Sequence, residues 1–231
     1  RPHQLQITRI ELQSFNSGYF FTILLIGVYI DMFWDRVAWI YDVFTNIINR
    51  KTHKALIDSI ERMISDNDDV LECACGTGLL SGTIAKHCKQ LVATDLSLKM
   101  LKRAKKKYKN IANIEFRQGN IMQIEYPSES FDIVVAANVI HLLDNPVKAL
   151  QELNRVCKKN GEIIVPTYIN QTAKGKTNKL SNLIGKAGAD FKKEFTFESY
   201  KEFFKNIGYN NVEYTLCEGK IPCAVAVIHK L

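Results

Sequence analysis

The sequence predicts an α/β fold in which a mostly parallel sheet is covered by helices on both faces. From residue 31 onward, short apolar runs alternate with amphipathic stretches, a pattern typical of strands and helices in a parallel sheet. Near the C-terminus, the apolar runs 212–216 and 221–228 are separated by only four residues. A link that short joins strands only in an antiparallel hairpin. We therefore expect five parallel strands followed by an antiparallel pair.

The individual elements follow from periodicity and from the residues that interrupt it. Ser97 is a favourable helix N-cap, Asn160-Gly161 is expected to end a helix, and Gly208 is a helix stop. In order, we expect a helix over 56–64, a strand over 70–73, a helix from the 76–78 turn to about 88, a strand over 91–94, a helix to about 107, strands over 114–117 and 131–137, a helix over 147–156, a strand over 162–168, a helix over 197–207 and the hairpin.

Composition points to one globular domain with an uneven charge distribution. The chain has 231 residues, 46% of them hydrophobic, and its 31 Lys and Arg against 24 Asp and Glu give a formal charge of +7. Much of the positive charge lies in one run of residues: Lys99, Lys102, Arg103, Lys105, Lys106, Lys107 and Lys109. We expect this run to form the solvated face of a helix, with contact to nucleic acid or anionic lipid as the alternative.

The six cysteines contain no CxxC pair and lie mostly in apolar segments. This favours buried, reduced thiols and a cytoplasmic protein rather than a disulfide framework. Cys73 and Cys75 are two residues apart, but no His or further Cys lies nearby in sequence to complete a tetrahedral site, so we expect no metal.

Residues 1–31 read as an N-terminal extension before the domain. The apolar stretch 19–30 is shorter than the roughly 20 residues that span a bilayer, and no small-residue cleavage site follows it. We expect a packed helix or an appendage here, with membrane contact through 19–30 as the alternative.

The strongest chemical signal is the loop from Glu72 to Gly78, followed by Asp95 at the end of the next expected strand. Glycines allow the backbone to pass close to a ligand, and a helix start presents free N–H groups that suit a carboxylate. A carboxylate at the position of Asp95 can accept hydrogen bonds from both ribose hydroxyls. Ser81 occupies the place of the third glycine in the dinucleotide fingerprint, which disfavours a pyrophosphate ligand.

Together with several later segments, this loop resembles the class I S-adenosylmethionine-dependent methyltransferases, especially the menaquinone and ubiquinone branch. The resemblance covers residues 33–229 and implies a Rossmann-like domain over 32–231, S-adenosylmethionine as cofactor and a small-molecule methyl acceptor. The further segments that carry it are 35–42, Gly119-Asn120-Ile121, 131–134, 155–161 and Gly208-Tyr209.

The resemblance also implies roles for individual residues around the cofactor. Family members more often have Asp at the position of Asn120, whose amide oxygen can still accept from an adenine amino group, so we expect weaker or altered binding there. By position, Glu72, Ala74, Gly76 and Gly78 would surround the methionine part, Asp95 would hold the ribose, Leu96 and Met100 would flank the adenosine, Asn120 and Ile121 would meet the adenine, and Asn138 would lie beside the cofactor.

Residues on the acceptor side are less clearly marked. The Tyr41 ring could stabilise a sulfonium charge, although it could equally pack a helix. His141 could act as a general base, or pack near the adenosine or cap a helix. Thr167 and Tyr168 end the fifth expected strand, where ligands of such sheets gather. The other histidines, His3, His53, His87 and His229, show no partner pattern and are expected to be structural or exposed.

These observations favour methyl transfer to a small or medium organic acceptor by in-line displacement. An NAD-dependent oxidoreductase is the alternative enzyme class, disfavoured by the missing third glycine and the terminal hairpin. A non-catalytic methyltransferase-like binding protein is the other alternative. Nucleic acid is a disfavoured partner because no aromatic and basic strip is evident. The sequence indicates neither the acceptor nor the oligomeric state.

Overall fold

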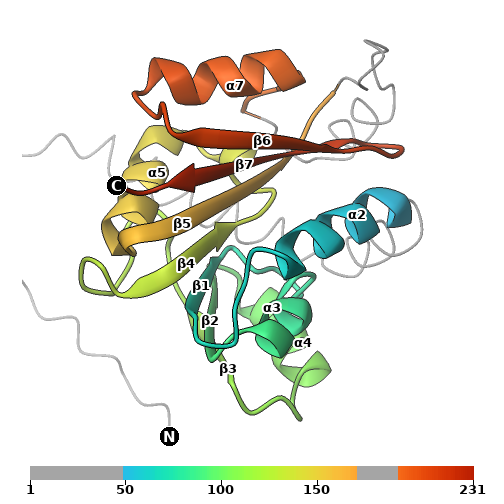
Figure 1. The fold of residues 1–231 in the computed structure, drawn as a ribbon. Coiled ribbons are helices and arrows are strands. Elements are labelled where there is room, and N and C mark those ends of the chain that lie inside the picture. The colour runs from blue at the N-terminus through green and yellow to red at the C-terminus, as the bar shows by residue number, and fades with distance from the viewer. Residues whose placement is uncertain (1–48, 171–191) are drawn as a thin grey trace, which may run out of the picture.

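The computed structural model describes residues 49–170 and 192–231, which contain seven strands and five α-helices (Figure 1). The strands are β1 (Asp69–Cys73), β2 (Gln90–Asp95), β3 (Ile114–Gln118), β4 (Phe131–Ala136), β5 (Cys157–Tyr168), β6 (Val212–Cys217) and β7 (Cys223–His229). The helices are α2 (Arg50–Glu61), α3 (Ser81–His87), α4 (Leu98–Lys107), α5 (Pro146–Val156) and α7 (Phe197–Asn206), with a 3₁₀ turn η2 (Ile140–Leu142).

All seven strands form one sheet in the order β3-β2-β1-β4-β5-β7-β6. The first five strands in this order are parallel, and β7 runs antiparallel to both β5 and β6. The predicted fold class and its C-terminal hairpin are confirmed. Because β1 and β4 are central and parallel, the loops after β1, β2, β4 and β5 emerge at one edge of the sheet, where ligands of such folds bind.

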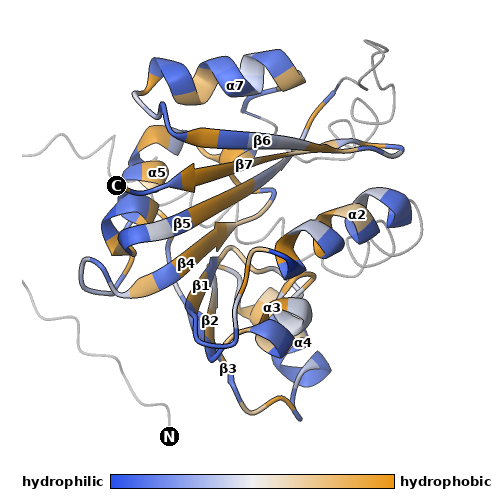
Figure 2. Cartoon of the chain, viewed as in Figure 1, coloured by the Kyte–Doolittle hydropathy of each residue, from blue (hydrophilic) through white to orange (hydrophobic). Residues whose placement is uncertain are grey.

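Two apolar cores lie on the two faces of the sheet. Alternate residues of β1 divide between them: Leu71 and Cys73 pack with α5 and α7, whereas Val70 packs with α2 and α3. The strands are correspondingly apolar on both faces, and the helices turn their polar sides outward (Figure 2). This arrangement makes the sheet a rigid support for the loops at its carboxyl edge.

Helix ends follow the expected capping chemistry. The Ser97 side chain accepts a hydrogen bond from the Met100 amide at 3.2 Å, which confirms Ser97 as the N-cap of α4. Thr196 and Ser199 form a capping box at the start of α7. Gly208 has a φ of +92° just beyond this helix, a conformation that strongly favours glycine.

Several element boundaries differ from the sequence prediction, most clearly those of β5 and α2. The strand β5 begins at Cys157, not at residue 162, and Asn160-Gly161 lies inside it as an irregular step with Asn160 at a φ of +62°. Cys157 already pairs with Phe131 there, and the register shifts before the next pair, so the break in pattern marks a distortion within the strand. Helix α2 starts at Arg50, before the apolar periodicity begins, because the buried residues of its first turns are the polar Thr52 and His53.

The six cysteines are all buried and free, as predicted. Within residues 49–170 and 192–231, no helix is both long and apolar enough to cross a bilayer, and no group of three or more His, Cys, Asp or Glu side chains is placed to hold a metal. The predicted extension 1–31 and Tyr41 lie outside these described ranges, as do residues 171–191.

Candidate cofactor and acceptor site

The loop after β1 is a tight, left-handed turn that is joined to β2. Ala74, Gly76 and Gly78 have φ values of +54°, +56° and +79°. The Cys75 amide donates to the Thr94 carbonyl at 2.9 Å, which fixes the loop against the end of β2. A Cβ built on Gly76 would meet no atom within 4 Å, so the loop faces open space at this position. The backbone is therefore accessible to a ligand where the sequence predicts one.

Asp95 lies directly beside this loop. One carboxylate oxygen accepts a hydrogen bond from the Gly76 amide at 2.8 Å, and the other accepts from the Ser97 amide at 2.8 Å. A carboxylate has about four lone-pair positions, so these two hydrogen bonds alone do not use up its acceptor capacity. The structure thus brings Gly76 and Asp95 together and holds the carboxylate in a fixed orientation.

Glu72 is buried beneath the start of α3 with 2% of its surface exposed. Its carboxyl accepts a hydrogen bond from the Ser81 hydroxyl at 2.5 Å. Burial raises the pKa of Glu72 to about 8, the nearby charge of Asp95 adds to the rise, and the Ser81 hydrogen bond and Lys107 oppose it. Glu72 is therefore mostly protonated at neutral pH. Ser81, at the place of the third fingerprint glycine, has a specific role as the partner of this acid.

Gly78 is required by a contact that sequence reasoning missed. A Cβ at Gly78 would lie 2.6 Å from a ring carbon of Tyr108, and one at Gly82 would lie 2.3 Å from the same ring. The Tyr108 hydroxyl donates to the Gly78 carbonyl at 2.7 Å. These glycines therefore make room for the Tyr108 ring against the start of α3, and the only sequence signal for this contact is the spacing of four residues between Gly78 and Gly82.

The residues predicted to meet the adenosine lie around the ends of β2 and β3. The Gly119 amide donates to the Asp95 carbonyl at 3.1 Å, which links the two strand ends. Leu96 is 40% exposed and Met100 is buried in the first turn of α4. The Asn120 side chain accepts from the Met122 amide at 2.9 Å in a local turn, and Ile121 beside it is buried.

Tyr168, which the sequence predicts on the acceptor side, is joined to Asn138 where the chain leaves β4 and β5. We call this part of the candidate site the acceptor side. Asn138 has a φ of +55°, and its amide donates to the Pro166 carbonyl at 2.7 Å. Its side-chain oxygen accepts from the Tyr168 amide at 3.1 Å. Asn138 therefore fixes the position of Tyr168 relative to β4.

Tyr168 lies between two buried imidazoles. Its hydroxyl is 2.5 Å from Nε2 of His53 on α2, and its ring centroid is 6.5 Å from that of His141 in η2. Burial lowers the pKa of His141 to about 3, so this imidazole is neutral. The His53 contact was not foreseen, because it joins residues 115 positions apart in the chain.

Two predicted acceptor-side residues are not brought into this group by the described structure. The Thr167 side chain is fully buried, and its hydroxyl donates to the Tyr200 hydroxyl of α7 at 3.4 Å, on the sheet face opposite Tyr168. Tyr41 lies outside the described residues.

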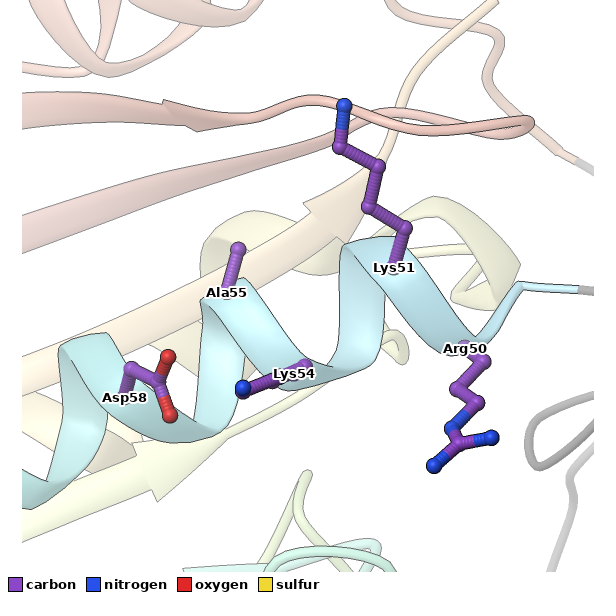
Figure 3. A pocket seen from close by; sticks show the side chains of 5 residues that line it. All are labelled: Arg50, Lys51, Lys54, Ala55 and Asp58. Atoms are coloured by element: carbon purple, nitrogen blue, oxygen red, sulfur yellow. The ribbon is translucent and has the colours of Figure 1, made fainter.

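A separate hollow lies along the outward side of α2 (Figure 3). It contains neither a glycine turn nor any of the residues predicted to bind the cofactor. Its side chains all come from α2: Arg50, Lys51, Lys54, Ala55 and Asp58. We therefore place the candidate site at the carboxyl edge of the sheet and not in this hollow.

Comparisons with known proteins relate the chain to methyltransferases. A family profile described as a methyltransferase domain matches residues 71–165, from the glycine loop into β5. The demethylmenaquinone methyltransferase of Alkalihalophilus pseudofirmus is 24% identical over 79% of this chain and 88% of its own length. The malonyl-[acyl-carrier protein] O-methyltransferase of Halalkalibacterium halodurans is 30% identical over 60% of this chain and 54% of its own length.

The fold is also shared with solved methyltransferase structures. A SAM-dependent methyltransferase from Thermotoga maritima superposes with a TM-score of 0.68 at 18% identity, covering 86% of this chain and 98% of that one. The glycine loop, the sheet order and the methyltransferase profile agree with one another. Residues 71–165 therefore match a methyltransferase domain family, and the described sheet has the fold of solved S-adenosylmethionine-dependent methyltransferases.

Proposed function

We propose that this chain transfers a methyl group from S-adenosylmethionine to a small or medium-sized organic acceptor at the carboxyl edge of β1, β2, β4 and β5. The observation that carries the proposal is the contact between the Gly76 amide and the Asp95 carboxylate. This contact holds the accessible glycine turn next to the Asp95 carboxylate, which can accept hydrogen bonds from ribose hydroxyls. A nucleoside ligand requires both features.

The residues present fit the cofactor. The open space at Gly76 leaves room for a ligand against the backbone, and Asp95 is oriented for the ribose hydroxyls. Leu96 and Met100 would flank the adenosine, while Asn120 and Ile121 would meet the adenine. Glu72, Ala74, Gly76 and Gly78 would surround the methionine part, with Asn138 beside it. When bound, S-adenosylmethionine supplies an electrophilic methyl group on a sulfonium.

On the acceptor side, we assign Tyr168 to contact the nucleophile and His53 to position the phenol. For an acceptor with an O–H or N–H nucleophile, the Tyr168 oxygen takes the proton of the nucleophile and passes its own proton to Nε2 of His53. The new bond joins the nucleophile to the methyl carbon, and the electron pair of the broken carbon–sulfur bond stays on sulfur. His141, neutral and beside Tyr168, would exclude water from the site; its lowered pKa argues against the role of general base.

The relatives suggest where to begin the search for an acceptor. Demethylmenaquinone appears in the name of a relative that aligns with most of the chain, so it is the first acceptor to assay. Screening extracts for molecules that gain a labelled methyl group extends the search to other acceptors.

Calorimetric titration of the purified chain with S-adenosylmethionine and with NAD tests the cofactor assignment. We expect binding of the first and none of the second. Asp95→Ala should weaken cofactor binding by about 1–3 kcal/mol, the range for removing a partner of buried polar groups. Asp66→Ala, at an exposed carboxylate in the loop before β1, is the matched control and should leave affinity unchanged. Tighter binding of NAD, or equal affinity in the Asp95 variant, would overturn the proposal.

A further inference from the structure

The positive charge of this protein is concentrated on one helix. Of its 31 Lys and Arg residues, seven lie between Lys99 and Lys109, and the remaining 24 equal the 24 Asp and Glu residues. No acidic residue occurs between Asp95 and Glu115. The whole formal excess of +7 therefore comes from α4 and the residues that directly follow it.

These cations form a continuous outward surface. In α4, the buried residues are Met100, Leu101 and Ala104, so the helix packs on the domain through one narrow face. Lys102, Lys105 and Lys106 are exposed on the opposite side, and within the described ranges none of them forms an ion pair. Hydrophilic residues accordingly predominate along the α4 ribbon (Figure 2).

An exposed leucine extends the same surface. Leu98 is 63% exposed and lies four, seven and eight residues before the three lysines, so all four side chains share one face of the helix. Leu96, 40% exposed, lies just before it. Among the described residues, the only other large apolar side chain exposed to this degree is Leu231 at the chain end. Exposed leucines next to unpaired lysines are typical of a surface that contacts lipid.

We propose that this face of α4 binds the surface of an anionic lipid bilayer, with the lysines at the headgroups and Leu98 inserted between them. The composition favours lipid over nucleic acid. Six of the seven cations are Lys, which acts as a point charge, and only Arg103 has the planar group that recognises phosphate in two-point geometry. The nearby aromatic ring, Tyr108, is packed against Gly78 and Phe116 and is not presented for base stacking.

The location of this surface connects it to the proposed reaction. Leu96 follows Asp95 directly, so α4 begins at the rim of the cofactor loop. A bilayer bound along α4 would therefore lie near the carboxyl edge of the sheet, where an acceptor dissolved in the membrane could reach the site. The binding itself is independent of the methyl-transfer proposal and can be tested without an acceptor.

The test is sedimentation of the full chain with vesicles of phosphatidylcholine alone or of phosphatidylcholine mixed with phosphatidylglycerol. We expect binding to the mixed vesicles only, weakening as salt is added. The triple substitution Lys102→Gln, Lys105→Gln and Lys106→Gln should reduce the partition coefficient about 100-fold, at about fivefold per cation. Leu98→Ser should reduce it by about tenfold.

A matched triple substitution separates local binding from net charge. Lys159→Gln, Lys205→Gln and Lys220→Gln removes three exposed lysines from other elements and should leave vesicle binding within about twofold of wild type. Equal losses in the two triple variants, or no binding to phosphatidylglycerol vesicles, would overturn the proposal. So would tight binding of poly-uridine together with unchanged vesicle binding in the α4 variant. Circular dichroism of each variant verifies that it is folded.

Discussion

The two sides of the site are held together in different ways. On the cofactor side, Asp95 accepts hydrogen bonds from the amides of Gly76 and Ser97, which lie 19 and 2 positions away in the chain. On the acceptor side, Tyr168 is fixed by Asn138, 30 positions away, and by His53, 115 positions away. The cofactor side is thus built from one strand–loop–helix unit and its neighbour, whereas the acceptor side is assembled from distant segments.

From this difference we expect that cofactor binding and acceptor chemistry can be altered separately. Asp95 ends β2 and is held by the amides of Gly76 and Ser97, whereas Tyr168 ends β5 and contacts His53 on α2. Substitutions on one side should therefore change cofactor affinity and those on the other should change the turnover rate.

The largest expected effect is on the acceptor side. Tyr168→Phe keeps the ring and removes the phenol oxygen, so kcat should fall by about 10²- to 10⁴-fold, the range for general acid–base groups. Cofactor affinity, measured by calorimetry, should be unchanged. Tyr214→Phe, a tyrosine on β6, is the control and should keep wild-type kcat.

The double variant tests the His53 contact. His53→Gln should also lower kcat, and combining it with Tyr168→Phe should cost no more than Tyr168→Phe alone, because both changes interrupt one proton path. A solvent deuterium isotope effect on the wild-type rate that disappears in Tyr168→Phe would support proton transfer. Additive losses in the double variant would contradict it.

The same contrast explains what could be predicted from the sequence. The strands, the hairpin and the pairing of the glycine loop with Asp95 follow from short-range patterns that neighbouring residues set locally. The contact of His53 with Tyr168 depends on how α2 docks on the sheet, and a single histidine in a polar first turn shows no periodicity. Similarly, Gly78 was identified as a ligand-binding glycine, while its contact with Tyr108 requires the packing of α4 on α3.

Two glycines in the same loop provide the next test. Gly78→Ala would force a Cβ to within 2.6 Å of Tyr108 at a φ of +79°, so the free energy of unfolding should fall by about 3 kcal/mol. Gly76→Ala meets no atom and should cost only about 1–2 kcal/mol for its left-handed backbone. Urea unfolding measures both values.

Gly76→Ala should have the smaller effect on stability but a clear effect on cofactor affinity. The Cβ added at Gly76 enters the open space proposed for the cofactor, so affinity should fall by at least about tenfold, or about 1.4 kcal/mol. If calorimetry finds Gly76→Ala binding as well as wild type, the cofactor does not lie against this turn.

Glu72 predicts a pH dependence on the cofactor side. Its folded-state pKa of about 8 lies above the ordinary value of 4.5, so the folded protein holds a proton that the unfolded chain releases. The stability from this proton is complete below pH 4.5 and is lost as the pH rises through about 8. Glu72→Gln cannot lose a proton and should flatten the decline in unfolding free energy over this interval. Glu125→Gln, at an exposed carboxylate, should retain the wild-type slope.

Cofactor binding should respond to the same proton. The cationic sulfonium and ammonium groups of S-adenosylmethionine favour ionised Glu72, so binding should release a proton and weaken as the pH falls below about 8. Calorimetry in two buffers of different ionisation enthalpy measures that release. Proton uptake on binding would show that Glu72 is not close to the positive charge.

The smallest expected effect concerns two residues with a left-handed backbone, Ala74 on the cofactor side and Asn138 on the acceptor side. Ala74 has a φ of +54°, a conformation that costs a residue with a Cβ about 1–2 kcal/mol, whereas glycine adds about 0.5–1 kcal/mol of chain entropy. Ala74→Gly should therefore raise the unfolding free energy by about 0.5–1 kcal/mol. Asn138 has nearly the same φ, +55°, but its side chain holds the Tyr168 amide. Asn138→Gly should therefore lower the unfolding free energy, because it removes the hydrogen bond to the Tyr168 amide. The left-handed conformation of Ala74 after β1 supports no such long-range hydrogen bond within the described part of the chain, so the two glycine substitutions should have opposite effects.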